Sequence, residues 1–191
     1  QRHGLTNRNP AGVSLARPGQ GHWRNLLLAE LTRALGEAEP GLDTRRLLKR
    51  VRFPDRIRDR QVVVHDMSEP GTWVAVRGTP VRVATVGQTF LDTLLHPAWC
   101  GGMAHVLEVW EEHAATFLEE IIAALDGSPR QIAKVRAGYI LQERLGFVDK
   151  RIEAWARFAQ RGGSQVLDPS KAYTPGKKPV FSEKWMIALN A

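Results

Sequence analysis

The feature that most limits the fold is a run of apolar residues at helical spacing in residues 103–125. Residues three and four positions apart share one face of an α-helix, so the run predicts a helix that packs this face against a core. Its members are Met103, Val106, Leu107, Trp110, Ala114, Phe117, Leu118, Ile121 and Leu125. We expect the longest helix to span about 103–125, with Gly101 and Gly102 turning the backbone sharply before it.

Residues 61–85 differ from this helical pattern because they are rich in β-branched side chains. The segments QVVVH, TWVAV and PVRVAT are separated by the turn sequences SEPG and RGTP. β-branched residues favour strands, so the region predicts two or three antiparallel strands, the last two joined by a tight turn at 77–80. A further short strand is expected at 13–16, and Thr85 and Thr89 are expected to begin the next helix.

Separate strand-forming and helix-forming stretches indicate an α+β fold, in which an antiparallel sheet of short strands packs against several helices. The length of 191 residues predicts a single domain over 1–191. Residues 168–179 hold three prolines and are expected to form a surface loop. Aromatic and aliphatic residues at helical spacing are expected in the core: Trp110, Phe117, Ile121, Ile140, Trp155 and Phe158.

The net charge of +7 is concentrated in a basic helical segment at about 23–60. Within it, residues 43–60 read DTRRLLKRVRFPDRIRDR, with eight Lys/Arg against three Asp. Such a density attracts polyanions through counterion release, which makes nucleic acid a possible partner. The candidate nucleic-acid-binding residues are Arg45, Arg46, Lys49, Arg50 and Arg52. The alternative interpretation is a solvated helix face in a protein from an arginine-rich proteome.

Histidines 96, 105 and 113 and the single Cys100 suggest a metal site, but their spacing argues against one. In a helix over 103–125, His105 would face water, and His113 would lie about 12 Å farther along the axis, too far for one ion. His96 and Cys100 supply only two ligands. We therefore expect no bound metal.

The sequence also lacks the common catalytic motifs. It has no Gly-rich phosphate loop and no nucleophile elbow, and its carboxylates lie at ordinary solvated positions. We expect no catalytic residue, no cofactor and no enzymatic activity. Asp92, between apolar neighbours, is either a structural anchor for the amides that open the next helix or a functional acid.

Cellular location is suggested by two simple observations. One cysteine cannot form an internal disulfide, which fits a reducing compartment, and no apolar run is long enough to span a bilayer. No positively charged and then apolar stretch follows Gln1, so we expect no secretion. We expect a cytoplasmic protein that does not contact a membrane.

Several stretches resemble the AbiE-type (AbiEi-like) abortive-infection antitoxins, the transcriptional-regulator half of type IV toxin–antitoxin pairs. They lie in the family's order and span most of the chain: HGLTNRNPAGVSLA (3–16), VRVATVGQTFLDTLLHPAWCGG (81–102), GYILQERLG (138–146), and VLDPSKAY (166–173) with FSEKWMIALN (181–190). The central stretch is the most specific of them.

The resemblance implies an antiviral antitoxin that neutralises a nucleotidyltransferase-like toxin, directly or indirectly, and regulates transcription. Family members typically bind promoter DNA through an N-terminal winged helix. The HGLT sequence follows that winged helix in the family but begins here at residue 3, so we expect the winged helix to be absent from this chain. The basic segment is also longer than the family pattern at that point. The alternative function is a basic DNA-binding transcriptional regulator without an antitoxin role.

Overall fold

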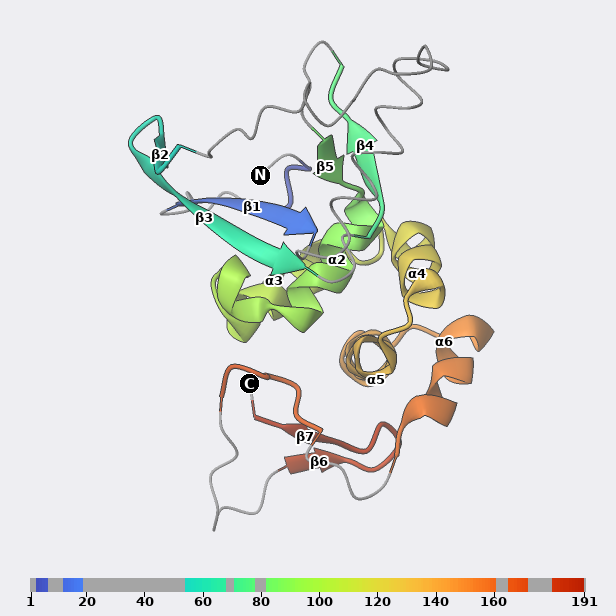
Figure 1. The fold of residues 1–191 in the computed structure, drawn as a ribbon. Coiled ribbons are helices and arrows are strands. Elements are labelled where there is room, and N and C mark those ends of the chain that lie inside the picture. Colours follow the sequence, from blue (N-terminus) through green and yellow to red (C-terminus); the bar gives the residue numbers. More distant parts are fainter. Residues whose placement is uncertain are drawn as a thin grey trace, which may run out of the picture. The chain divides into compact units, whose positions relative to one another are not determined.

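The computed structural model describes residues 3–6, 12–18, 54–67, 71–77, 82–160, 165–171 and 180–190. The chain divides into two compact units. The strand unit is Arg8–Pro70, and the helical unit is Gln1–Asn7 with Gly71–Ala191. Both units contain elements drawn in Figure 1. The expectation of a single domain over 1–191 stays a prediction.

The strand unit holds a three-stranded sheet in the order β1-β3-β2. Its strands are β1 (Gly12–Pro18), β2 (Arg56–Ile57) and β3 (Arg60–Met67). β1 runs parallel to β3, with Val13 opposite Val62, and β2 runs antiparallel to β3. Alternate residues of β1 and β3 are half-buried, which is the period-two pattern of a sheet with one covered face.

The expected short strand at 13–16 is confirmed, but the expected pairing of strands is corrected. β3 does not join the later strands; it pairs with β1, which lies far away in the sequence. β4 (Trp73–Ala75) and β5 (Arg82–Ala84) form a separate antiparallel pair in the helical unit, as expected for the last two strands. Their connecting turn includes residues outside the described ranges. Alternation of side chains predicts a strand but not its partner.

The helical unit confirms the α+β class, with helices and short sheets in one body (Figure 1). Its helices begin with α2 (Val86–Leu95), the short 3₁₀ helix η2 (Pro97–Cys100), α3 (Met103–His113) and α4 (Leu118–Gly127). They continue with α5 (Gln131–Gly138), the π-helix η3 (Tyr139–Arg144), α6 (Lys150–Ala154) and the 3₁₀ helix η4 (Trp155–Phe158). The antiparallel strands β6 (Val180–Ser182) and β7 (Ile187–Leu189) follow.

Residues near both ends of the segment 81–102 fold as the sequence predicts. Thr85 caps α2, because its Oγ1 accepts a hydrogen bond from the Gln88 amide at 3.2 Å. Gly101 and Gly102 have φ values of 92° and 90°, in the left-handed region that favours glycine. They allow the sharp turn from η2 into α3.

The expected helix over 103–125 is two helices, so its predicted length is wrong. α3 ends at His113 and α4 begins at Leu118, with a turn between them. The apolar pattern continues across the break because buried residues of both helices, among them Trp110 and Ile121, belong to the same core. Periodicity indicates which face of a helix packs against a core. It does not detect a short turn that divides the segment into two helices packed on the same core.

The core of the helical unit surrounds α5, which Figure 1 shows nearly along its axis. All six residues 133–138 are buried, so this helix has no solvent-facing side over that length. Four of the expected core residues are buried, and two, Phe117 and Phe158, are partly buried against the core. Among the tryptophans in the described ranges, Trp110, Trp155 and Trp185 are the least exposed.

Candidate functional site

The predicted nucleic-acid-binding residues lie outside the part of the chain that the structure describes. They are Arg45, Arg46, Lys49, Arg50 and Arg52. Of the basic segment at about 23–60, only residues 54–60 are described, and they form a hairpin of β2 and β3 instead of a helix. The nucleic-acid role of the five residues therefore stays a prediction.

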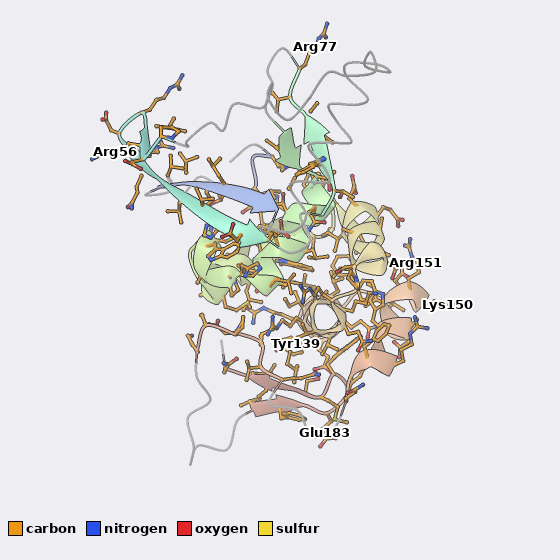
Figure 2. The ribbon with its side chains drawn as sticks, in the orientation of Figure 1. Arg56, Arg77, Tyr139, Lys150, Arg151 and Glu183 are labelled. Atoms are coloured by element: carbon orange, nitrogen blue, oxygen red, sulfur yellow. The ribbon has the colours of Figure 1, made fainter. Side chains whose placement is uncertain are left out.

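The β2–β3 hairpin presents exposed arginines on a tight turn. Ile57 pairs with Arg60, so Arg58 and Asp59 alone connect the two strands. Both have positive φ, 47° and 62°. The Arg56 guanidinium supports the turn by donating from Nη2 to the Asp59 carbonyl at 2.7 Å. Figure 2 labels Arg56 on this hairpin.

Asp92 lies in a partly buried polar cluster at the start of the helical unit. Gln88 Nε2 donates to Asp92 Oδ1 at 2.8 Å, and Gln88 Oε1 accepts from the Thr72 amide at 3.3 Å. Of the two interpretations of Asp92, a structural anchor for the following amides is not supported at Gly101 and Gly102. The amides of Gly101 and Gly102 instead donate to the carbonyl of Pro97.

Burial raises the pKa of two side chains in this region, Asp92 and Cys100. Burial raises the pKa of the Asp92 carboxyl to about 6, against a smaller lowering by the Gln88 hydrogen bond. Burial also raises the pKa of the Cys100 thiol, and the negative charge of Asp92 raises it further. At neutral pH the Asp92 carboxylate is therefore ionised in surroundings that disfavour its charge.

We expect Asp92→Asn to stabilise the protein at pH 7 and to weaken its pH dependence. The folded pKa of Asp92 lies above its unfolded value, so the folded state binds the proton more tightly and its stability falls as pH rises from about 4 to about 6. Asparagine keeps an oxygen acceptor for Gln88 but cannot ionise. The expected gain at pH 7 is about 2 kcal/mol.

Urea unfolding of both proteins at pH 4 and pH 7 measures this effect. The difference in unfolding free energy between Asp92→Asn and the wild type should be larger at pH 7 than at pH 4. An equal difference at the two pH values would contradict the raised pKa of Asp92.

His96, His105 and Cys100, which the structure describes, do not converge on one site. His96 stacks on Trp99 with ring centroids 3.8 Å apart. His105 contacts Thr6 and Glu108, and its side chain is only 11% exposed, so the expectation that it faces water is wrong. Residues 3–6 cover this part of α3. Within the described ranges, no group of three or more His, Cys, Asp and Glu side chains is placed to hold a metal ion.

Two buried cations of α5, which sequence reasoning missed, bind backbone carbonyls of other elements. Arg136 donates from Nη1 to the Leu94 carbonyl at 2.8 Å and from Nε to the Val166 carbonyl at 3.0 Å. Lys134 Nζ donates to the Ser128 carbonyl at 2.9 Å. Leu94 is in the last turn of α2 and Ser128 is the C-cap of α4, so each cation stabilises the carbonyl end of a neighbouring helix.

Arg136 also faces a buried carboxylate. Burial lowers the pKa of the Arg136 guanidinium to about 10, while the charge of Asp168 acts to raise it. Asp168 is 1% exposed and accepts from the Ser170 amide at 2.9 Å. The expectation of a surface loop at 168–179 is thus wrong at its first residue, and residues 172–179 lie outside the described ranges. The only sequence signal was the position of Lys134 and Arg136 among small and apolar residues.

Trp185 closes the core against α5. A Cβ atom added to Gly138 would lie 2.1 Å from a Trp185 ring carbon, so only glycine permits this approach. The adjacent Ser182 hydroxyl donates to Glu143 at 2.8 Å, which ties the β6–β7 strands to η3.

Comparisons with protein-family models, with curated proteins and with solved structures gave no significant match. In the described parts of the chain, no helix combines the length and the apolar character needed to cross a membrane.

Proposed function

We propose that this protein is the antitoxin of a type IV toxin–antitoxin pair and neutralises a nucleotidyltransferase-like toxin. The observation that supports the proposal is a set of contacts between distant parts of the sequence. The stretches that resemble the AbiE-type antitoxins are far apart in the sequence, yet described residues from all of them belong to connected contacts within the helical unit.

The first stretch meets the second at the edge of the β4–β5 pair. His3 Nε2 lies 2.8 Å from the Ala84 carbonyl oxygen. Leu5, between His3 and Thr6, is buried in the same core as the helices of the second stretch. The HGLT sequence thus contributes to the packing of the helical unit.

The second, third and fourth stretches meet around α5. Arg136 binds carbonyls of Leu94 in the second stretch and Val166 in the fourth. Gly138, the first residue of the third stretch, contacts Trp185. The two parts of the fourth stretch are joined by Asn190, whose Oδ1 accepts from the Asp168 amide at 2.8 Å and whose Nδ2 donates to the Asp168 carbonyl at 2.9 Å.

These contacts are what the proposal requires, because stretches that determine one fold together must pack against one another. The proposed antitoxin acts through surface shape and charge, without a reactive centre of its own. It works in the cytoplasm beside its toxin, a reducing compartment that suits the single Cys100.

A growth assay tests the proposal directly. The genes beside the one that encodes this chain are searched for a nucleotidyltransferase-like reading frame, which is then expressed alone and together with this chain. The toxin alone should arrest growth, and co-expression should restore it. Arrest that persists although this chain is folded and abundant would contradict the antitoxin function, as would a genome without such a neighbouring frame.

A second candidate function is DNA binding and transcriptional regulation by this chain. It is favoured by the eight Lys/Arg of residues 43–60 against three Asp. Phosphate contacts made by such a segment release counterions, so affinity for DNA should fall steeply as salt rises. This function can accompany the antitoxin role or replace it.

We expect the double substitution Arg46→Glu and Arg50→Glu to weaken DNA binding by about tenfold or more without unfolding the protein. Two attractive charges would become repulsive toward phosphate. Fluorescence anisotropy with a labelled promoter duplex measures the affinity, and circular dichroism checks the fold. Unchanged affinity would exclude these two arginines from the DNA contact.

A further inference from the structure

The β2–β3 hairpin has a turn whose residues do not match its backbone. Positive φ at both connecting residues defines a type I′ turn, in which Asn-Gly is the favoured pair. Here the pair is Arg58-Asp59, with φ values of 47° and 62°. Aspartate tolerates the left-handed region, but an arginine there is unfavourable because of its Cβ atom.

The rest of the hairpin holds this unfavourable conformation in place. The Arg56 guanidinium donates to the Asp59 carbonyl at 2.7 Å, and the Val62 amide donates to the Asp55 carbonyl at 2.8 Å. Strained residues that are kept by their surroundings are concentrated at functional sites. Glycine would fit this backbone without strain but has no side chain. The arginine at position 58 therefore points to a function for its guanidinium.

The charges of the hairpin suit a polyanion. Arg56 and Arg58 are exposed, and Arg60 is half-buried at the start of β3. Asp55 and Asp59 partly offset them, which leaves an excess of one positive charge over residues 55–60. This hairpin directly follows the other basic residues of 43–60 in the sequence, so its arginines add to an already positive region.

We propose that the β2–β3 hairpin contacts the phosphate backbone of duplex DNA, with Arg56 and Arg58 as its phosphate-binding residues. The planar guanidinium of an arginine can donate two parallel hydrogen bonds to a phosphate. The inference rests on the second proposed function, DNA binding by this chain. It is independent of toxin neutralisation.

The decisive variant is Arg58→Gly in the full chain. Glycine removes the guanidinium but accepts the left-handed backbone without strain, so the melting temperature should equal or exceed that of the wild type. Affinity for a promoter duplex should fall by about threefold to tenfold at about 0.1 M salt, and the slope of log affinity against log salt should become shallower by about one. A loss of affinity then cannot come from unfolding.

Two matched variants complete the experiment. Arg58→Lys keeps the charge and should keep the salt slope of the wild type. Arg77→Gln removes one exposed arginine from the helical unit, labelled in Figure 2, and should change the affinity by less than about twofold. A scrambled duplex of equal length should show the same Arg58→Gly loss as the promoter duplex, because phosphate contacts carry no sequence information.

The possible results separate the two proposals. If the wild type binds DNA but Arg58→Gly has the same affinity and salt slope, the hairpin inference is overturned and DNA binding by the chain stands. If the wild type binds neither duplex, both are overturned. If Arg58→Gly keeps DNA affinity but no longer restores growth against the toxin, the hairpin contacts a protein partner instead of DNA.

Discussion

Gly138→Ala should destabilise the helical unit by about 3 kcal/mol, although alanine is normally the better helix residue. The added Cβ atom would lie 2.1 to 2.6 Å from three carbons of the Trp185 ring. Trp185 is fully buried and cannot move away without displacing its own neighbours. Urea unfolding followed by far-UV circular dichroism measures the loss.

Gly127→Ala is the matched control for this substitution. Gly127 is also helical, at the end of α4, but no atom lies within 4 Å of the position that its Cβ would take. The control should be neutral or stabilising by up to about 1 kcal/mol. Equal stability of the two alanine variants would show that Trp185 does not pack against α5 as described.

Arg136→Met should lower the free energy of unfolding by about 3 to 5 kcal/mol. Methionine fills much of the same volume but donates no hydrogen bond to the carbonyls of Leu94 and Val166. It also removes the positive charge that faces the buried Asp168. A buried polar group that loses its hydrogen-bond partner still has the full free-energy cost of removal from water, with no bond to offset it.

The control for Arg136→Met is Arg144→Met, which removes an exposed arginine. Arg144 pairs with Glu111, and both side chains are about two-fifths exposed. Surface ion pairs contribute little, so the expected loss is at most about 1 kcal/mol. A similar loss in both variants, measured by urea unfolding, would mean that the burial of Arg136 has no special energetic role.

Local features of the fold could be predicted from the sequence because they depend on neighbouring residues. The Thr85 cap requires only a hydroxyl three residues before an amide that it can reach. Gly101 and Gly102 take left-handed φ values that other residues adopt rarely. The strand at β1 follows from the turn-forming residues on either side of it, and the core positions of Trp110 and Ile121 follow from helical periodicity.

Features that join distant residues could not be predicted in the same way. β1 and β3 pair across more than forty residues, and the alternation within each strand carries no information about its partner. Likewise, the charges of Arg136 and Asp168 suggested solvent. Their burial depends on carbonyls of α2 and of residue 166, which no local pattern connects to α5.

The candidate DNA-binding residues could also be predicted only in part from the sequence. Counting charges marked residues 43–60 as a whole and selected five positions between 45 and 52. It did not distinguish Arg56 and Arg58, because the turn that exposes them is recognised only from its backbone angles. The favoured Asn-Gly pair is absent from the sequence at this turn, so the hairpin itself was not predicted.

The central position of α5 has a consequence for synthesis on the ribosome. Arg136 binds the Val166 carbonyl and faces Asp168, which Asn190 holds, and Gly138 packs against Trp185; these four partners are all translated after α5. A nascent chain that stops after α5 would expose apolar side chains together with unpaired charges. The helical unit should therefore acquire its native packing only after residue 190 has emerged, and shorter nascent chains should be the main targets of chaperones and proteases.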